Sequence, residues 1–330
     1  MSKDQIVFIG AGAIGTSLGN SMVKNQDLEV ILFSIEEEVV RTINENHINK
    51  KYFPGILLNP NLKATQSNEA IQNAGFIFMA IPSVETVHYL KKHQVIIPPD
   101  AIIVNLAKGF GEHNCTIVRC LKEFLPNQVC TMKGPTFARD IINNQPTAFT
   151  VGSENPELFK HFKRLFAGTN IYLDFSTDIH GVEILSILKN IYAIVAGITD
   201  ASFDAPNLRS LVLTKAFKEM RNILLEFGCD ENTMFKYCGF GDFTLTALND
   251  LSRNRTLGLL IGKGFFTREM SDKVVLEGKI AVNVLVEVMA LRKLSDQFPI
   301  LHELHKVFND NYDLSQFVSR IIAFNGIEEN

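Results

Sequence analysis

The sequence predicts an α/β protein: an N-terminal Rossmann-type domain with a parallel sheet over residues 1–178, followed by an all-helical C-terminal domain over residues 179–330. With 330 residues, the chain exceeds the size at which a single hydrophobic core keeps growing, so we expect two domains. Short apolar runs alternate with helical patterns in the first domain, which is typical of a parallel sheet covered on both faces. Strand-like runs nearly vanish after Asp178, and long helical patterns replace them.

The first three predicted elements form a βαβ unit. Residues 5–9 are a β-branched and aromatic run, residues 14–23 are amphipathic, and residues 28–33 are a second apolar run. A unit of this kind takes about thirty residues. Further buried strands are predicted at residues 75–80, 101–106, 129–132 and 148–151. Helices of the C-terminal domain are predicted at residues 181–199, 207–227, 230–236, 243–263, 269–293 and 300–307.

Composition and charge exclude several classes of protein. A net charge of -4, with lysines and arginines scattered along the chain, argues against nucleic acid as a partner. No apolar signal segment precedes the first strand, and no stretch of about twenty residues stays apolar and uncharged. The longest apolar run, residues 187–198, contains Lys189 and Asn190 near its start. We therefore expect a cytoplasmic protein without a membrane span.

The cysteines and histidines give no sign of a disulfide framework or a metal site. The five cysteines are odd in number and form no Cys-x-x-Cys pair, so we interpret them as reduced packing residues. The eight histidines are scattered, and no His, Cys or Asp spacing resembles a set of metal ligands. We predict that the protein holds no metal.

A glycine motif of the G-x-G-x-x-G type lies between the first predicted strand and the first predicted helix. Gly10 permits the tight turn, Gly12 lets the backbone approach a pyrophosphate, and Gly15 allows the helix to pack closely on the strand. The helix N-terminus then offers N–H groups to the phosphates. Ala13 and Ile14 occupy the variable positions and are predicted cofactor contacts. The alternative is that these glycines only form a turn.

The end of the second predicted strand leaves the choice between NAD and NADP open. In an NAD-specific site, an acidic residue about twenty positions after the glycines binds the ribose 2′-hydroxyl. Ser34 stands at that place. Its side chain neither repels a 2′-phosphate nor supplies a cation that would attract one.

Candidate site residues follow three neighbouring strands at their carboxyl ends, where open α/β sheets bind ligands. Pro82 follows the strand at 75–80, and Lys108 follows the strand at 101–106, so both are expected beside the cofactor. Gly134 and Thr136 follow the next strand, where small residues allow backbone amides to meet an anionic substrate. The alternative for Lys108 is a solvated loop lysine.

Lys189 and Asn190 are embedded among apolar residues of the first helix of the C-terminal domain. Burial of a lysine is costly unless the group is used. A desolvated lysine exchanges protons more readily near neutral pH, which suits a general acid for carbonyl reduction. The alternative is a structural lysine that reaches the surface with its amine.

A second polar segment of the C-terminal domain combines an acid with arginines. Asp242 lies in a glycine-rich turn at a predicted helix start, and Ser252, Arg253 and Asn254 follow it in the sequence. Arginine together with helix-start amides suits a phosphate group. The alternative is an ordinary capped helix with solvated arginines.

Taken together, these segments resemble the NAD(P)-dependent glycerol-3-phosphate dehydrogenase family, with similarity from Val7 to about Gly278. The order of the motifs is the same as in that family. The residues that carry the resemblance are the stretches 10–16, 52–55, 81–83, 108–109, 134–138, 189–190, 239–242, 245–246 and 252–255.

The resemblance implies reversible hydride transfer between C2 of sn-glycerol 3-phosphate and the nicotinamide of NAD or NADP, which gives dihydroxyacetone phosphate. It also implies a homodimer and a role in glycerophospholipid precursor synthesis. It makes Lys189 the proton acceptor in oxidation and the donor in reduction, with Lys108 and Asp242 holding and polarising the substrate. Further substrate contacts are implied for Gly134, Thr136, Asn190, Thr246, Ser252, Arg253 and Asn254. Further dinucleotide contacts are implied for Ala138, Arg253, Val275 and Glu277.

The chain departs from the family pattern in four places. Ala13-Ile14 replaces a small residue followed by an aromatic one, and Asp140 replaces a glutamate. Residues 108–112 are one residue longer, and residues 200–207 are one shorter and lack glycines. Two alternatives therefore stand: a related ketopantoate-reductase-like enzyme, or a dinucleotide-binding protein with impaired catalysis. The segment 252–255 favours a phosphorylated substrate over the first of these.

Overall fold

The structure is a computed structural model that describes residues 4–265, 277–294 and 297–324. The described residues fall into two compact units, which divide the chain as Met1–Glu183 and Ile184–Asn330. We call them the N-terminal unit and the C-terminal unit. The division lies inside helix α8 (Ile179–Ser202), whereas the boundary predicted from the sequence, after residue 178, coincides with the start of that helix.

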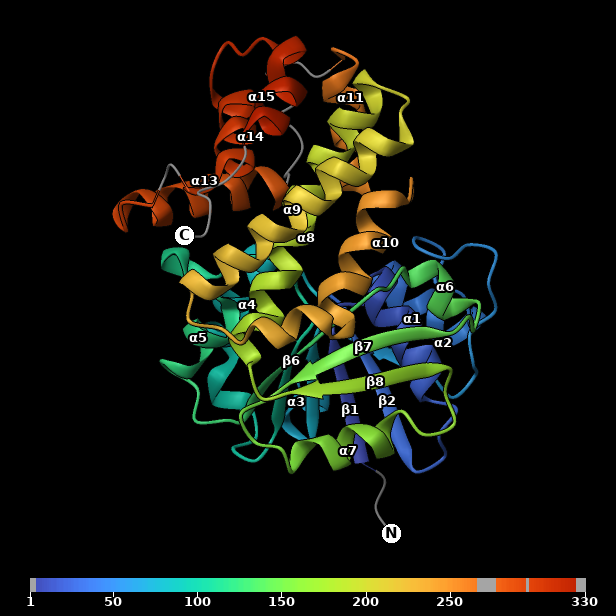
Figure 1. Cartoon of the computed structure of the whole chain (residues 1–330). Coiled ribbons are helices and arrows are strands. Elements are labelled where there is room, and N and C mark those ends of the chain that lie inside the picture. Colours follow the sequence, from blue (N-terminus) through green and yellow to red (C-terminus); the bar gives the residue numbers. More distant parts are fainter. Residues whose placement is uncertain (1–3, 266–276, 295–296, 325–330) are drawn as a thin grey trace. The chain divides into compact units, whose positions relative to one another are not determined.

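The N-terminal unit is built on a sheet whose eight strands all lie within the described residues, in the order β3-β2-β1-β4-β5-β6-β7-β8 (Figure 1). The predicted strands are confirmed to within two residues at either end. Their bounds are β1 (Asp4–Ile9), β2 (Leu28–Phe33), β4 (Phe76–Met79), β5 (Ile102–Asn105), β6 (Val129–Lys133) and β7 (Thr147–Gly152).

Two strands at the edges of the sheet were not predicted. β3 (Lys63–Thr65) has three residues, of which Ala64 is the buried one. β8 (Ile171–Ser176) is mostly half-buried and includes the exposed Tyr172. An edge strand is covered less completely than an inner one, so its sequence lacks the continuous apolar run by which the inner strands were identified.

The predicted parallel sheet is confirmed, with one pair of strands as the exception. β7 pairs antiparallel with β6, and β8 then pairs parallel with β7. The connection from β6 to β7 contains only the short helix α6 (Ala138–Ile142), not a full crossover helix. A parallel neighbour usually needs a crossover helix that runs back along the length of the sheet, and the five residues of α6 are too few to provide one.

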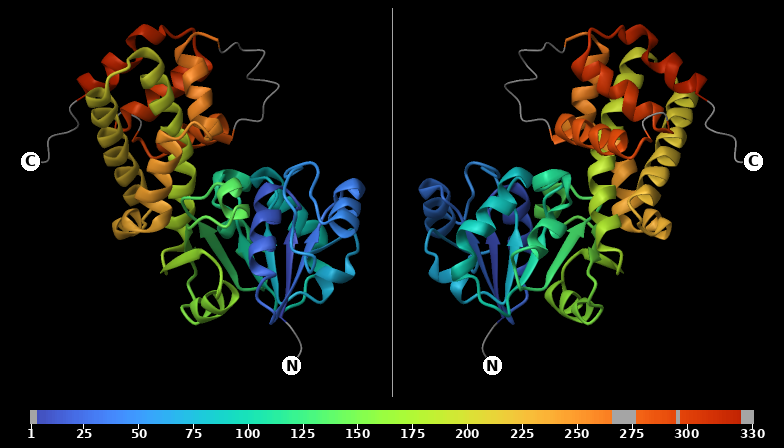
Figure 2. Two further views of the ribbon diagram at one scale, coloured as in Figure 1. Left: turned by 90° about the vertical axis from the view of Figure 1, so that its right-hand side faces the viewer. Right: turned by 90° about the vertical axis from the view of Figure 1, so that its left-hand side faces the viewer.

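Helices cover both faces of this sheet (Figure 2). One hydrophobic core contains Ile6 and Phe8 of β1, and the other contains Val7 and Ile9, because successive strand residues point to opposite faces of the sheet. The first core is covered by α1 (Ala13–Met22), α2 (Glu37–Asn46), α6 and α7 (Leu158–Leu165). The second is covered by α3 (Glu69–Gln72), α4 (Ser83–His93) and α5 (Ile117–Lys122). The strand order reverses between β1 and β4, which is where ligands bind in open α/β sheets.

The C-terminal unit is helical, and no strand occurs among its described residues. This confirms the predicted class. Its helices are the remainder of α8, α9 (Pro206–Glu226), the short turns η3 (Glu231–Phe235) and η4 (Tyr237–Gly241), α10 (Asp242–Leu248), α11 (Arg253–Gly262), α13 (Glu277–Leu291), α14 (Pro299–Asn309), η6 (Leu314–Gln316) and α15 (Phe317–Ala323).

Several helix boundaries differ from the prediction. The helix predicted at 243–263 is broken into α10 and α11, because Asn249 is extended and the Ser252 side chain caps α11 by accepting the Arg255 N–H at 3.3 Å. The segment predicted at 230–236 is a 3-10 helix, η3, and α15 was not predicted. Part of the helix predicted at 269–293 lies outside the described residues.

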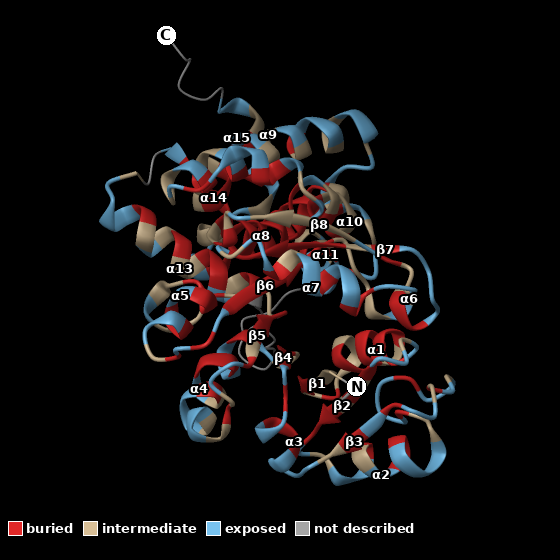
Figure 3. Ribbon diagram, turned by 90° about the horizontal axis from the view of Figure 1, so that it is seen from below, coloured by how far each residue is buried: buried red, intermediate tan, exposed pale blue. Residues whose placement is uncertain are grey.

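Helix α8 is long and apolar enough to cross a bilayer, but its apolar window is entirely buried inside the protein (Figure 3). The two polar residues near the start of its apolar run, Lys189 and Asn190, are buried with it. Complete burial is typical of the core helix of a globular protein.

All five cysteines are free thiols, as predicted, and four of them are buried. Burial raises the pKa of the Cys120 thiol to about 11 and also raises that of Cys130. A thiol with a raised pKa holds little thiolate and is therefore unreactive.

Candidate functional site

The glycine turn after β1 has a backbone that other residues adopt only with strain. Gly10 has a φ of +110°, and a Cβ there would lie 2.6 Å from the Ala80 carbonyl oxygen. A Cβ on Gly15 would lie 2.1 Å from the Gly10 oxygen. The Gly10 N–H donates to the Phe33 carbonyl at 2.9 Å, which fixes the turn against the end of β2.

Gly12 leaves the start of helix α1 open to a ligand. It is the N-cap of α1, and a Cβ built on it would meet no atom closer than Tyr52 Cζ at 3.9 Å. Ala13 and Ile14 begin the helix and pack partly on the core. The positive end of the helix dipole therefore faces an accessible backbone, which suits the pyrophosphate of a dinucleotide. The turn fits the cofactor that the sequence predicted.

Asn49, whose role the sequence does not predict, supports this turn. It is fully buried, and its amide donates to the Ala11 carbonyl and to Thr16 Oγ1, both at 2.9 Å. Its side-chain oxygen accepts the Tyr52 N–H at 3.3 Å. A single asparagine in a polar segment gives no pattern from which burial can be read.

The other predicted cofactor contacts of the N-terminal unit lie at strand ends or helix starts. Ser34 directly follows β2, is buried, and accepts the Glu36 N–H at 3.1 Å. Pro82 is the N-cap of α4, and Ala138 is the first residue of α6. Val275 lies outside the described residues, as does the side chain of Glu277, the first residue of α13.

Lys108, Gly134 and Thr136 are brought together at the carboxyl ends of β5 and β6. Lys108 Nζ donates to the Gly134 carbonyl at 3.4 Å, and Thr136 Oγ1 donates to the same oxygen at 3.2 Å. Lys108 and Thr136 are half-buried, which leaves part of each accessible. Lys108 is therefore partly enclosed and partly open to solvent.

A group of three buried polar side chains under the Lys108 turn was also missed. Asn105, Lys133 and Glu183 are exposed by 0%, 0% and 2%. Lys133 Nζ donates to the carbonyls of Asn105, at 3.1 Å, and Ala107. Glu183 accepts from the Asn105 amide and from the Val118 N–H at 2.9 Å. The sequence signal for this group was Lys133, a charged residue at the end of a mostly apolar strand.

In the C-terminal unit, Lys189 is buried as predicted, but its charge is compensated. Its Nζ lies 2.6 Å from Asp242 Oδ1 and 2.9 Å from Thr246 Oγ1, and the Lys189 and Asp242 side chains are exposed by 6% and 0%. The pairing of Lys189 with Asp242 was not predicted from the sequence. A partner carboxylate offsets the cost of removing the ammonium from water.

Thr246 fixes the direction of the hydrogen bonds at Lys189. Its hydroxyl donates to the Asp242 main-chain carbonyl at 2.6 Å, so its oxygen accepts from Lys189. A hydroxyl has one proton to donate. Both Asp242 and Thr246 therefore act as acceptors, an arrangement that suits a protonated lysine. Asn190, next in the helix, is 6% exposed.

The predicted phosphate segment combines a cap, an exposed arginine and a buried one. Ser252 caps α11, Arg253 is exposed and Asn254 is half-buried. Arg255 is buried and pairs with Asp200 at 2.5 Å and with Asp250 at 3.0 Å. The alternative of a capped helix with solvated arginines is correct for the cap and wrong for Arg255, which holds the α10–α11 turn in place.

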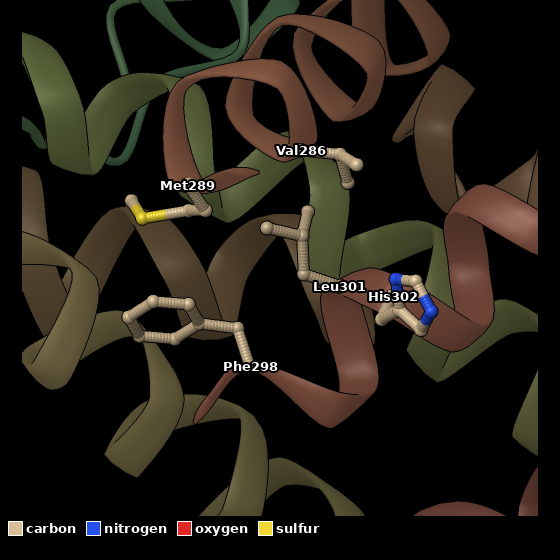
Figure 4. Close-up of a pocket in the computed structure, with 5 residues that line it drawn as sticks. All are labelled: Val286, Met289, Phe298, Leu301 and His302. Carbon is tan, nitrogen blue, oxygen red and sulfur yellow. The ribbon is translucent and has the colours of Figure 1, made fainter. Parts of the chain in front are cut away.

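The small cavity of Figure 4 does not contain any predicted site residue. It lies between α13 and α14 and has a volume of about 10 Å³, which is room for one water at most. It is lined by Val286, Met289, Phe298, Leu301 and His302. No cluster of three or more potential metal ligands is found within the part of the chain that the structure describes.

Comparisons with known proteins agree across the chain. A family model for the NAD-dependent glycerol-3-phosphate dehydrogenase N-terminus matches residues 5–159, and one for the C-terminus of the same enzyme matches residues 178–319. The chain is 31% identical to a glycerol-3-phosphate dehydrogenase (NAD(P)+) of Leptospira biflexa, over 97% of each chain. It is 32% identical to one of Methanothermobacter thermautotrophicus, over 96% of this chain and 98% of that protein. The crystal structure of glycerol-3-phosphate dehydrogenase from Coxiella burnetii has the same fold, with a TM-score of 0.89 at 24% identity over 98% of this chain and 100% of that one.

Proposed function

Since the chain belongs to the NAD-dependent glycerol-3-phosphate dehydrogenase family, we propose that it catalyses the reversible reduction of dihydroxyacetone phosphate to sn-glycerol 3-phosphate. It is an oxidoreductase, and its cofactor is NAD or NADP. When bound, the nicotinamide supplies the hydride that reduces C2 of the ketone. The buried Lys189 with its two acceptors, Asp242 and Thr246, is the observation that most strongly supports this reaction.

Lys189 supplies the proton in this proposal. Reduction places negative charge on the C2 oxygen, and a positioned ammonium stabilises that charge and transfers a proton to it. Asp242 and Thr246 orient the Lys189 amine through the 2.6 and 2.9 Å contacts. In the reverse direction, neutral Lys189 takes the proton of the C2 hydroxyl. Lys108 is proposed to hold and polarise the substrate.

Binding of the phosphate end positions the reacting end of the substrate. Arg253 is exposed on the first turn of α11, next to Ser252 and Asn254, and an arginine beside helix-start amides suits a phosphate. Energy from that remote contact is used to hold C2 in place for reaction. Gly134, Thr136 and Asn190 complete the proposed substrate contacts.

The dinucleotide is proposed to bind at the carboxyl edge of the sheet. Gly10, Gly12 and Gly15 hold the pyrophosphate, with Ala13 and Ile14 beside them. The remaining proposed contacts of the cofactor are Ser34, Pro82, Lys108, Ala138, Arg253, Val275 and Glu277.

A steady-state assay tests substrate and cofactor together. We expect oxidation of NADH or NADPH with dihydroxyacetone phosphate, at a kcat/KM well above that with ketopantoate. The two dinucleotides are compared at equal concentration, because Ser34 favours neither of them. Turnover of ketopantoate without turnover of dihydroxyacetone phosphate would contradict the proposal and favour the related reductase. Dinucleotide binding without turnover of either would favour an impaired enzyme.

We also propose that the protein is a cytoplasmic homodimer that supplies glycerol 3-phosphate for glycerophospholipid synthesis, as the family resemblance implies. Light scattering on the purified protein tests the oligomeric state. A dimer has twice the 37.0 kDa mass of one chain. A mass equal to one chain at enzyme-assay concentrations would contradict it.

A further inference from the structure

Lys108 and Lys133 each donate hydrogen bonds to the backbone of the turn beside the other lysine. β5 and β6 pair in parallel, with Asn105 opposite Thr131. Lys133, the last residue of β6, donates to the carbonyls of Asn105, at 3.1 Å, and Ala107, at the end of β5. Lys108, which follows that turn, donates in the opposite direction to the Gly134 carbonyl at 3.4 Å. The two turns are therefore linked by reciprocal side-chain contacts.

Burial of the Lys133 ammonium carries a large desolvation cost. It is 0% exposed and is among the largest fully buried side chains of the chain. A methionine would fill much of the same space without removing an ammonium from water. The N–H donors of Lys133 are the property that an apolar side chain lacks, and they are directed at two backbone carbonyls that flank Leu106.

The turn before Lys108 is held from several sides. The Asn105 side-chain oxygen accepts the Ala107 N–H at 3.0 Å, and the Asn105 amide donates to Glu183. Together with Lys133, these contacts engage the carbonyl and the N–H of Ala107, the residue directly before Lys108. A displacement of Ala107 therefore moves the Lys108 backbone.

We propose that Lys133 is a positioning residue that fixes the turn from which Lys108 reaches the substrate. The inference rests on the proposed function, because it acts through Lys108. Lys133 itself does not contact the reacting atoms in this account. Lys133 determines the position of the Lys108 ammonium. The rate of catalysis is sensitive to shifts of about 1 Å in such a group.

The test is a double-mutant cycle between Lys133→Met and Lys108→Ala in the full chain. Alone, Lys133→Met is expected to lower kcat for dihydroxyacetone phosphate reduction by about 10²-fold. The Kd for NADH is expected to change much less, since Lys108 is only one of many proposed cofactor contacts. In the Lys108→Ala background, the same substitution is expected to change kcat little, since the residue through which it acts is gone. An equal loss of kcat in both backgrounds, or no loss in the wild-type background, would overturn the proposal.

Controls separate positioning from general damage to the strand. Cys130→Ala removes another buried side chain of β6, which contacts the Ile103 carbonyl inside the sheet at 3.6 Å, and is expected to leave kcat unchanged. If Lys133→Met does not fold, Lys133→Ala, which also lacks the N–H donors and needs less space, takes its role in the cycle. Failure of the wild-type enzyme to reduce dihydroxyacetone phosphate would refute the proposed function, whereas additive losses in an active enzyme refute this inference alone.

Discussion

Lys189 has two properties that substitution can separate: it compensates a buried carboxylate, and it is the proposed proton donor. Lys189→Met is expected to lower kcat by about 10²–10⁴-fold, the usual contribution of a proton-transfer group. It also removes the ion-pair partner of the buried Asp242, which costs about 3–5 kcal/mol of stability. The Kd for NADH should not change, because the predicted dinucleotide contacts do not include this residue.

The double variant Lys189→Met/Asp242→Asn distinguishes the two properties. Removal of both charges is expected to recover much of the lost stability in urea unfolding, while kcat remains low. Recovery of kcat together with stability would show that Lys189 serves the fold and not the chemistry.

Glu219 makes the stability of the C-terminal unit depend on pH. It is buried on α9 and accepts from Tyr192 Oη at 2.8 Å and from the N–H groups of Ile300, at 3.0 Å, and Leu301, at 2.8 Å, at the start of α14. Burial raises its pKa from 4.5 to about 7, although these hydrogen bonds oppose the rise. The folded state therefore keeps a proton that the unfolded state has lost.

The raised pKa of Glu219 favours the fold below pH 4.5, and that contribution is lost as pH rises through about 7. We expect the free energy of unfolding to fall between these values by up to about 3 kcal/mol, at 1.36 kcal/mol per pKa unit. Glu219→Gln should lack this part of the slope. Unfolding of both proteins from pH 5 to 8 checks it, since other titrating groups contribute equally to each; parallel curves would refute the assignment.

At the scale of single residues, the sequence located groups that carry a motif and missed those that support them. Lys108, Lys189 and Asp242 stand in recognisable patterns. Asn49 and Glu183 do not, because an isolated polar residue reads the same whether it is exposed or fully buried. Lys189 and Asp242 are far apart in the sequence, and no local sequence pattern predicts that their side chains are in contact.

Helices α8 and α11 cross with their backbones in contact, and two glycines permit it. A Cβ on Gly258 would lie 2.1 Å from the Ile194 carbonyl oxygen, and one on Gly197 would lie 2.2 Å from that of Arg255. Gly258→Ala is expected to destabilise the protein by about 1–3 kcal/mol, the usual cost of overpacking. It should also raise KM for dihydroxyacetone phosphate, because α11 carries Ser252 to Asn254 at its start.

Gly55→Ala is the matched control for this substitution, since a Cβ at Gly55 meets no atom within 4 Å. Thermal unfolding and KM are measured for both variants. Equal effects of the two substitutions would argue against a special role of the helix crossing.

Elements were predicted well where burial is complete and poorly where it is partial. Inner strands such as β4 and β5 are continuous apolar runs, whereas the edge strands β3 and β8 are not. The direction of β7 depends on the connection that precedes it, not on the apolar content of the strand. The break between α10 and α11 was missed because apolar periodicity continues on both sides of the capping Ser252.

At the scale of the whole molecule, hydrogen exchange can show which unit binds the dinucleotide and which binds the substrate phosphate. A ligand at 100 times its Kd stabilises the state that binds it by about 2.7 kcal/mol, and amides near the ligand exchange more slowly. We expect NADH to slow hydrogen exchange after β1, β4 and β5 of the N-terminal unit. Glycerol 3-phosphate is expected to slow exchange at the start of α11. Protection by NADH confined to residues 184–330 would contradict the assignment of the dinucleotide site.

The first strand of the chain is also an inner strand of its sheet. β1 pairs with β2 on one side and with β4 on the other. A proteolytic cut that removed residues through Ile9 would leave β2 and β4 as two new edges with rows of unsatisfied backbone groups. Such edges recruit strands from other molecules. Loss of a few residues near the amino end is therefore expected to yield aggregates instead of a shortened, active enzyme.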